Sequence, residues 1–229
     1  MMDLVYICRR GDNEELRYSL RSIEKNFPNQ TVWVVGYKPN WYNGNFVPIE
    51  DISSKFNNIR IATLAICDIK EISNNFILMN DDFFLLKPIK RMPTFNGGLL
   101  ANKIVRYRQV APTSAYSILL KQTFDYLKYL GIDNPIDYDL HVPMPMNKQK
   151  LSCLKGVTAS LRSVYGNVYG IKSKQITDVK TYSKNNYMKT LQVENLDPTF
   201  ISSEDDSFGS LRRKVLLDMF PEPSKYESP

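Results

Sequence analysis

The stretch FILMNDDFFLLKP, residues 76–88, places two adjacent aspartates inside an apolar run. Asn80, Asp81 and Asp82 interrupt this run before the apolar residues resume. An unpaired carboxylate is costly to bury, so acidic side chains in such a segment are expected to be paired or to bind a metal ion. The residues before them, 75–80, are short and rich in β-formers, which predicts a strand that leads into the acidic pair.

The chain before this stretch alternates between two patterns. Residues 3–8 and 31–36 are short and rich in β-formers, which predicts two strands. Residues 14–27 repeat apolar side chains on one face of a helix. Asp12, followed by Glu15, resembles a capping box at the start of this helix.

A second helix is predicted over residues 57–69, so the first 80 residues alternate strand, helix, strand, helix, strand. Strands separated by helices imply right-handed crossovers and a parallel sheet. The predicted fold class is α/β, with a Rossmann-like, mostly parallel sheet flanked by helices. Ligands of such sheets bind beyond the carboxyl ends of the strands. Both RRGD (9–12) and NDD (80–82) follow a predicted strand directly.

The remainder of the chain is less regular and more helical. Helices are predicted over 112–131, 158–167 and 206–220, and residues 137–151 begin extended and enter a short helix. The sequence contains no internal repeat, low-complexity tract or obvious linker. One domain over 1–229 is therefore the predicted organisation.

Composition restricts the classes of partner. The 229 residues include 30 Lys and Arg against 24 Asp and Glu, a net charge of +6 that favours nucleotide phosphates, acidic glycans or nucleic acid. No apolar run reaches the roughly 18 residues that span a bilayer, and the N-terminus does not resemble a signal peptide. Three widely spaced cysteines indicate neither a disulfide framework nor a zinc site, so we expect a cytoplasmic protein.

The acidic pair has the chemistry of a cation site. If the strand continues, Asn80 and Asp82 share one face and Asp81 lies on the other. Oxygen ligands at that spacing suit Mg²⁺ or Mn²⁺, which would bridge a nucleotide-sugar diphosphate. The spacing resembles the Asp-x-Asp element of GT-A glycosyltransferases, with Asn80 in the first acidic place. The alternative is that an aspartate caps a turn or pairs with a basic residue such as Lys87.

Four blocks of sequence resemble the Stealth family of sugar-phosphate transferases, which includes capsular-polysaccharide enzymes. The likeness is strongest in NEELRYSLRSIEKNFP (13–28) and ISNNFILMNDDFFLLKP (72–88), and weaker in LHVPMPMNK (140–148) and in SSEDDSF with FPEPSKYE near the end. Phage-encoded proteins assigned as glycosyltransferases look like a compact version of the same pattern. The opening DLVYICRRGD lacks the Trp-Val-Asp-Gly block of larger members, so the donor loop differs.

The resemblance implies a GT-A-like fold and a nucleotide-sugar donor, with a UDP-sugar favoured. It implies transfer of the sugar or the sugar 1-phosphate to a hydroxyl of a glycan or other acceptor, in a bacterial or phage-infected cell. Residues 1–90 would form the nucleotide-binding part and 91–229 the acceptor side. One alternative acceptor is a modified base of phage DNA, which would require a basic groove. The other alternative is a non-catalytic binding module with the same fold.

The resemblance also implies roles for individual residues. Asp81 and Asp82 match the family's acidic pair, which would serve the metal and the diphosphate or position the acceptor. Arg17 matches the family's helix arginine, which would grip phosphate. His141, the sole histidine, lies at the family's His-x-Pro position and would take the proton of the acceptor hydroxyl.

Other candidates have a plain structural alternative. Asp12 and Arg162 are candidates for binding the donor, but Asp12 could cap a helix and Arg162 could be a structural helix arginine. A further carboxylate could come from DD at 205–206, which could equally cap the last helix. Trp41 and Tyr42 could stack on a sugar or a base, or could fill an apolar gap in the loop.

Overall fold

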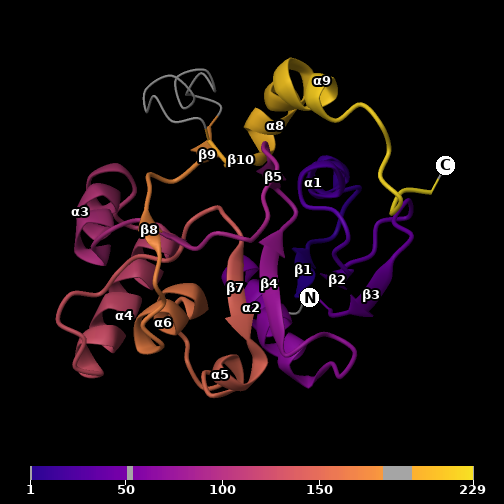
Figure 1. The fold of residues 1–229 in the computed structure, drawn as a ribbon. Coiled ribbons are helices and arrows are strands. Elements are labelled where there is room, and N and C mark those ends of the chain that lie inside the picture. The colour runs from indigo at the N-terminus through magenta and orange to yellow at the C-terminus, as the bar shows by residue number, and fades with distance from the viewer. Residues whose placement is uncertain (1, 51–53, 183–197, 229) are drawn as a thin grey trace. The chain divides into compact units, whose positions relative to one another are not determined.

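The computed structural model describes residues 2–50, 54–182 and 198–228 (Figure 1). The chain divides into two compact units. The first takes its described residues from 1–92, 141–146 and 179–229, and the second consists of Pro93–Leu140 and Asn147–Asp178. The prediction of one domain, with a nucleotide-binding part and an acceptor-side part, stays a prediction.

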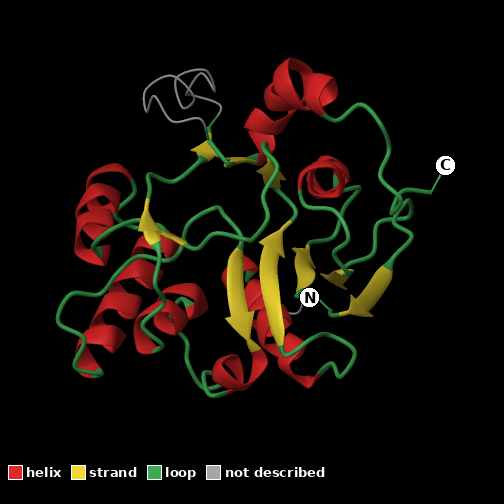
Figure 2. Ribbon diagram, viewed as in Figure 1, coloured by secondary structure: helices red, strands yellow, loops and turns green. Residues whose placement is uncertain are grey.

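A five-stranded sheet forms the centre of the first unit, in the order β3-β2-β1-β4-β7. The pairs β1–β2, β1–β4 and β2–β3 are parallel. Figure 2 shows the arrow of β7 running opposite to that of β4. The predicted α/β class, with a mostly parallel sheet flanked by helices, is confirmed. The strands are β1 (Asp3–Cys8), β2 (Val32–Gly36), β3 (Asn45–Pro48), β4 (Asn75–Asn80) and β7 (Met144–Asn147).

Burial explains why β1 occupies the middle of this sheet. All six of its residues are buried, as a strand covered on both faces requires. The carboxylate of Asp3 accepts a hydrogen bond from the backbone N–H of Ser73 at 2.8 Å, which satisfies the one charged group at its start. The first two helices of the chain, α1 (Glu14–Asn26) and α2 (Lys55–Ala65), belong to the same unit, and a 3-10 turn, η1 (Ile66–Asp68), follows α2.

A second, three-stranded sheet in the first unit has the order β5-β10-β9. Helix α1 packs against β5 through polar as well as apolar side chains. Asn26 donates a hydrogen bond to the carbonyl of Leu85 at 2.7 Å, and Ser22 accepts one from the N–H of Leu85 at 3.0 Å. The strands are β5 (Phe83–Leu85), β9 (Lys180–Thr181) and β10 (Phe200–Ser203).

The last helical segment closes an apolar cluster over this small sheet. It consists of α8 (Asp205–Leu211), the π-helical η2 (Arg212–Leu216) and α9 (Leu217–Met219). The buried members of the cluster come from α1, β5, β10, this segment and the C-cap residue that follows it: Tyr18, Phe84, Ile201, Leu211, Leu216 and Phe220. Residues from both ends of the sequence therefore share one core.

The second unit is mainly helical. A buried ion pair joins Lys103 and Asp137 at 2.9 Å, and the Lys103 ammonium also donates to the carbonyl of Asp139 at 2.7 Å. Its elements are β6 (Phe95–Asn96), α3 (Leu100–Val110), α4 (Ala115–Tyr129), α5 (Lys148–Ser152), α6 (Leu161–Val168) and β8 (Lys174–Gln175).

Two local expectations from the sequence are wrong. Strand β4 ends at Asn80, and Asp81–Asp82 form a turn rather than its continuation. Helix α1 begins at Glu14, and its N-cap residue is Asn13 in the left-handed conformation, without a capping hydrogen bond from its side chain. The capping box lies elsewhere, between Glu204 and Ser207 at the start of α8.

Candidate active site

The acidic turn lies where the strand order of the central sheet reverses. Strand β1 has β2 on one side and β4 on the other, and Ile7 pairs with Asn80. The residues that follow these two strands, Arg9 and Asp81, are therefore neighbours. In open parallel sheets this reversal point is the usual place for a ligand.

Asp81 carries a carboxylate in an unusual state. Its side chain is 13% exposed, and Arg9 Nε lies 3.9 Å from Oδ2, too far for a hydrogen bond. Oδ2 is buried and has no hydrogen-bond partner within the described residues. Burial, and then repulsion from Asp82, raises the pKa of Asp81 to about 7, although Arg9 opposes this shift. Near neutral pH, this group is poised between its protonated and charged forms.

Asp82 is held by partners from the small sheet. Its Oδ2 accepts a hydrogen bond from the Ser202 hydroxyl at 2.8 Å, and Lys180 Nζ lies 3.8 Å from the same oxygen. Both partners belong to strands of the β5-β10-β9 sheet. Pairing with a basic residue, one of the alternatives raised by the sequence, thus holds for Asp82 with Lys180. The contacts from Ser202 and Lys180 both involve the Oδ2 atom of Asp82.

Arg9 is the cation at the centre of this cluster. Its Nη1 and Nη2 donate to the two oxygens of Asp205 at 2.8 and 2.6 Å, and Nη2 lies 3.6 Å from Glu15. The hydrogen bonds from Arg9 lower the pKa of Asp205, whereas burial raises the pKa of Glu15. Four carboxylates, two basic side chains and one hydroxyl therefore meet here: Glu15, Asp81, Asp82, Asp205, Arg9, Lys180 and Ser202.

The backbone before Arg9 is fixed by two local features. Gly36 pairs with Cys8 and has φ +116°, and a Cβ on it would lie 2.4 Å from the Cys8 carbonyl oxygen. The Asn13 amide donates to the Arg9 carbonyl at 2.6 Å and to Cys8 Sγ at 3.0 Å. These contacts fix the backbone of the turn that carries the Arg9 side chain.

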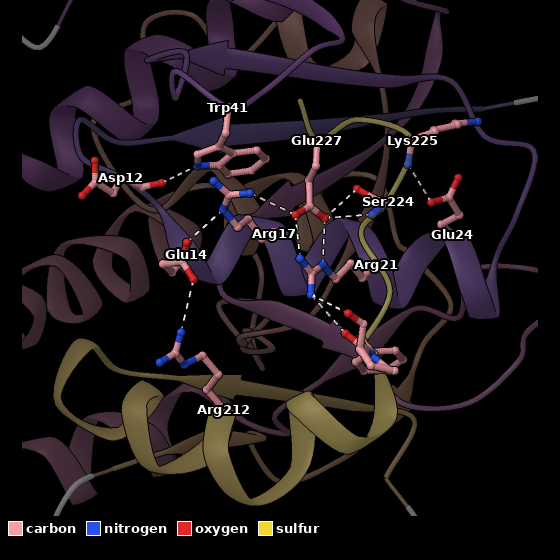
Figure 3. A network of polar contacts seen from close by, with 12 residues as sticks. Asp12, Glu14, Arg17, Arg21, Glu24, Trp41, Arg212, Ser224, Lys225 and Glu227 are labelled. Atoms are coloured by element: carbon pink, nitrogen blue, oxygen red, sulfur yellow. Dashed lines mark hydrogen bonds and ion pairs between the residues drawn. The ribbon is translucent and has the colours of Figure 1, made fainter. Parts of the chain in front are cut away.

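Arg17, predicted to bind phosphate, belongs to a second polar network (Figure 3). Its guanidinium lies 2.9 Å from Glu14 and donates to Glu227 at 3.0 Å, and it stacks over the ring of Trp41 at 4.2 Å. Arg21 donates to the same Glu227. The predicted role of Arg17 toward a donor stays a prediction, and in this structure its guanidinium is bound to carboxylates.

The loop candidates are placed next to this network. The carbonyl of Asp12 accepts a hydrogen bond from the Trp41 indole N–H at 2.7 Å, and the Asp12 side chain is exposed (Figure 3). Tyr42 is buried and stacks on Tyr226 with the ring centroids 6.2 Å apart. Tyr42 therefore fills an apolar gap, and the Trp41 ring faces Arg17.

The remaining candidates lie on other elements of the chain. His141 is half-buried just before β7 in the first unit. Arg162 lies in the second unit, where Nε donates to the carbonyl of Tyr138 at 3.2 Å. Burial lowers the pKa of Arg162, and Asp139 opposes that shift. Asn80 ends β4 and is half-buried.

A divalent ion would require oxygen ligands from these side chains. The described residues contain no group of three His, Cys, Asp or Glu side chains arranged to hold a metal ion. The buried, unpartnered Oδ2 of Asp81 nevertheless fits a cation that takes its remaining ligands from a bound diphosphate. Asp81 and Asp82 thus have the chemistry of a site that a substrate completes.

The sequence did not predict four residues of this cluster: Arg9, Glu15, Lys180 and Ser202. Arg9 opens the RRGD segment directly after a predicted strand, and that position is the signal that identifies it. Glu15 was interpreted as half of a capping box. Lys180 and Ser202 come from strands that no pattern predicted.

Similarity to known proteins is found in the structure and not in the sequence. No family model and no curated protein sequence matches. The chain is similar to the structure of the glycosyltransferase GlyE from Streptococcus pneumoniae TIGR4, with 10% identity, 88% of this chain and 55% of that chain covered, and a TM-score of 0.44. The chain is also similar to the galactosyltransferase LgtC in complex with donor and acceptor sugar analogs. That match has 11% identity, covers 99% of this chain and 85% of that chain, and has a TM-score of 0.40.

The bifunctional glycosyltransferase WbbM gives 12% identity, covers 88% of this chain and 45% of that chain, and has a TM-score of 0.43. The chain spans about half the length of the GlyE and WbbM chains. At these scores and identities the similarity decides nothing about activity, which must be inferred from the site. Among the described residues, every helix is too short or too polar to cross a membrane.

Proposed function

We propose that this chain is a nucleotide-sugar-dependent transferase that moves a sugar or a sugar 1-phosphate to an acceptor hydroxyl on a glycan. The main support is the buried, unpartnered Oδ2 of Asp81, beside Asp82 at the reversal of strand order between β1 and β4. An oxygen in this state lacks the partner that a buried carboxylate requires. Its position is one where open parallel sheets bind ligands.

Asp81 and Asp82, together with Asn80, would hold a Mg²⁺ or Mn²⁺ ion against the diphosphate of a UDP-sugar. Such an ion would stabilise the charge that builds on the leaving phosphate. Ser202 and Lys180 fix Asp82 by binding its Oδ2 side. Asp81 can supply its free oxygen without first breaking a hydrogen bond.

His141 would accept the proton of the acceptor hydroxyl, because imidazole has its ordinary pKa near neutrality. Asp12, Arg17 and Arg162 stay candidates for binding the donor, and Arg17 would exchange Glu227 for it. A cytoplasmic location fits the three widely spaced cysteines, Cys8, Cys67 and Cys153.

The test is to incubate the protein with a panel of UDP-sugars and Mn²⁺ or Mg²⁺, with and without EDTA, and to separate the products by chromatography. UDP as product indicates transfer of the sugar, whereas UMP indicates transfer of the sugar 1-phosphate. Asp82→Asn should lower the rate by about 100-fold or more, because one charged group that stabilises the leaving phosphate is lost.

Asp133→Asn is the matched control, since the Asp133 side chain is 90% exposed in the second unit and pairs with Lys128. This control should retain the full rate. The absence of both turnover and metal-dependent nucleotide binding in the unaltered protein would contradict the proposal and favour a non-catalytic binding module.

A further inference from the structure

Arg9 and Asp205 form a bidentate pair, in which one guanidinium donates two hydrogen bonds to one carboxylate. Nη1–Oδ2 is 2.8 Å and Nη2–Oδ1 is 2.6 Å, although the residues lie 196 positions apart in the chain. A guanidinium binds two oxygens of a phosphate in the same fork geometry in which it binds a carboxylate. The Asp205 carboxylate therefore occupies a position on Arg9 that fits a phosphate group.

The pair is exposed enough to exchange partners. The Arg9 side chain is 43% exposed and that of Asp205 is 70% exposed. Exposed ion pairs typically contribute about 0.2–1 kcal/mol, because water solvates the separated charges well. Asp205 can thus leave Arg9 for solvent at small cost when a stronger anion arrives.

Arg9 itself would stay in place when Asp205 leaves. Its guanidinium lies 3.6 Å from Glu15 and 3.9 Å from Asp81, and both acidic side chains are largely buried. Its backbone carbonyl is bound by the Asn13 amide. These contacts leave the Nη1–Nη2 edge aimed at the position that Asp205 now occupies.

We propose that Arg9 binds the diphosphate of the donor, and that Asp205 occupies the same edge of the guanidinium until the donor displaces it. This inference rests on the transferase function proposed above and adds to it a residue that binds the leaving group. The exchange forms and breaks ionic hydrogen bonds alone, with no covalent step.

The charges around Arg9 make this exchange depend on a cation. Glu15 and Asp81 lie within 4 Å of the Arg9 guanidinium, and Asp82 adjoins Asp81, so their negative charges would repel a diphosphate bound to Arg9. A divalent ion bound by Asp81 and Asp82 would remove that repulsion. Binding of a diphosphate should accordingly be weak in EDTA and stronger with Mg²⁺.

The test measures the affinities of UDP and of inorganic pyrophosphate by isothermal titration calorimetry in Mg²⁺. Asp205→Asn should bind both probes about two- to fivefold more tightly than the unaltered protein, because the competing carboxylate is gone. Asp205→Ser is a second variant with the same expectation. Arg9→Lys should bind both probes at least about tenfold more weakly, since an ammonium cannot form the bidentate fork.

Asp218→Asn is the control for net charge, because Asp218 is exposed on α9 and loses the same charge. Its affinities should stay within about twofold of the unaltered protein. A general loss of folding would weaken binding in every variant, so tighter binding by Asp205→Asn identifies competition at Arg9. Thermal melts of each variant confirm that it is folded.

Any one of three results would overturn the inference. Asp205→Asn and Asp205→Ser could bind the probes no more tightly than Asp218→Asn does, or Arg9→Lys could bind them as tightly as the unaltered protein does. The third result is that neither probe binds to the unaltered protein. Failure of the proposed function gives a different pattern. If the substitutions of Arg9 and Asp205 change the affinities for pyrophosphate and UDP as expected but no UDP-sugar is consumed, the anion site stands and the transferase proposal fails. If a UDP-sugar is consumed while Arg9→Lys keeps its affinity, the transferase stands and the inference fails.

Discussion

Glu227 and Arg21 are joined by two hydrogen bonds across 206 positions of sequence, with Arg21 Nε and Nη2 donating to the two carboxylate oxygens at 2.8 and 2.7 Å (Figure 3). The Glu227 side chain is 2% exposed and that of Arg21 is 13% exposed. Arg17 and the backbone N–H of Ser224 donate to the same carboxylate. The last described segment is thereby fastened to helix α1.

Glu227→Gln should destabilise the protein by about 2–4 kcal/mol, because the largely buried Arg21 guanidinium loses its counter-ion and Arg17 keeps only Glu14. Burial would raise the pKa of Glu227, but the hydrogen bonds from Arg21, Ser224 and Arg17 lower it from 4.5 to about 2. The folded pKa is below the unfolded one, so the stabilisation is present above pH 4.5 and is lost as the pH falls toward 2.

Urea unfolding of both proteins at pH 7, 4 and 2.5 measures this difference. The exposed Glu222→Gln is the control and should unfold like the unaltered protein at every pH. A Glu227→Gln protein as stable as that control at pH 7 would show that the ion pairs contribute nothing.

Asp81→Asn should stabilise the metal-free protein at alkaline pH. The folded pKa of about 7 lies above the ordinary value of 3.8, mainly because the carboxylate is buried. Asp81 therefore favours folding below pH 3.8, and that contribution is lost as the pH rises through 7. At about 1.4 kcal/mol per pKa unit, the gain at pH 8.5 is up to about 4 kcal/mol.

Thermal unfolding in EDTA from pH 4 to 8.5 tests this expectation. The two melting temperatures should coincide at the acid end and separate as the pH rises. The same substitution should abolish the stabilisation that Mg²⁺ with UDP gives the unaltered protein. Equal melting temperatures at pH 8.5 would mean that the carboxylate is well solvated.

Gly36→Ala should destabilise the protein by about 2–4 kcal/mol, since the added Cβ would lie 2.4 Å from the Cys8 carbonyl oxygen and φ is +116°. It should also weaken UDP binding, because the displaced Cys8 directly precedes Arg9. Gly156→Ala is the matched control, with no atom within 4 Å of the new methyl group. Equal denaturant midpoints for the two variants would contradict the steric argument.

His141→Gln should slow transfer to the acceptor by about 10²–10⁴-fold, the usual contribution of a general base. The affinity for UDP should change little, because the histidine is proposed to act on the acceptor. Transfer rates and calorimetric affinities separate the two effects. An unchanged transfer rate would remove His141 from the mechanism.

Local patterns predicted the core of the sheet well. Residues 3–8 and 75–80 are short runs rich in β-formers and mostly buried, and β1 and β4 have those bounds. The acidic pair was identified because carboxylates inside an apolar run need an explanation. Its conformation was predicted wrongly, because a strand that passes from one sheet to another turns at Asp81–Asp82, and pleat alternation carries no signal of such a turn.

The other half of the site could not be predicted from local patterns. Asp205 reaches Arg9 from the far end of the sequence, and β10 forms because Phe200–Ser203 pairs with β5 in the antiparallel direction. The pattern at 206–220 indicated a helix, which is observed, but the π-helical turn within it was not expected. Contacts of such long range depend on the packed core, which single-sequence periodicity does not describe.

The core shared by the two ends of the sequence has a consequence for synthesis. A nascent chain emerging from the ribosome carries Tyr18 and Phe84 long before Ile201 and Phe220 exist to cover them. Loops of this length close slowly, and uncovered aromatic surface invites association between unfinished molecules. Chaperone dependence during translation is the expected result, with release once the final helical turns have docked.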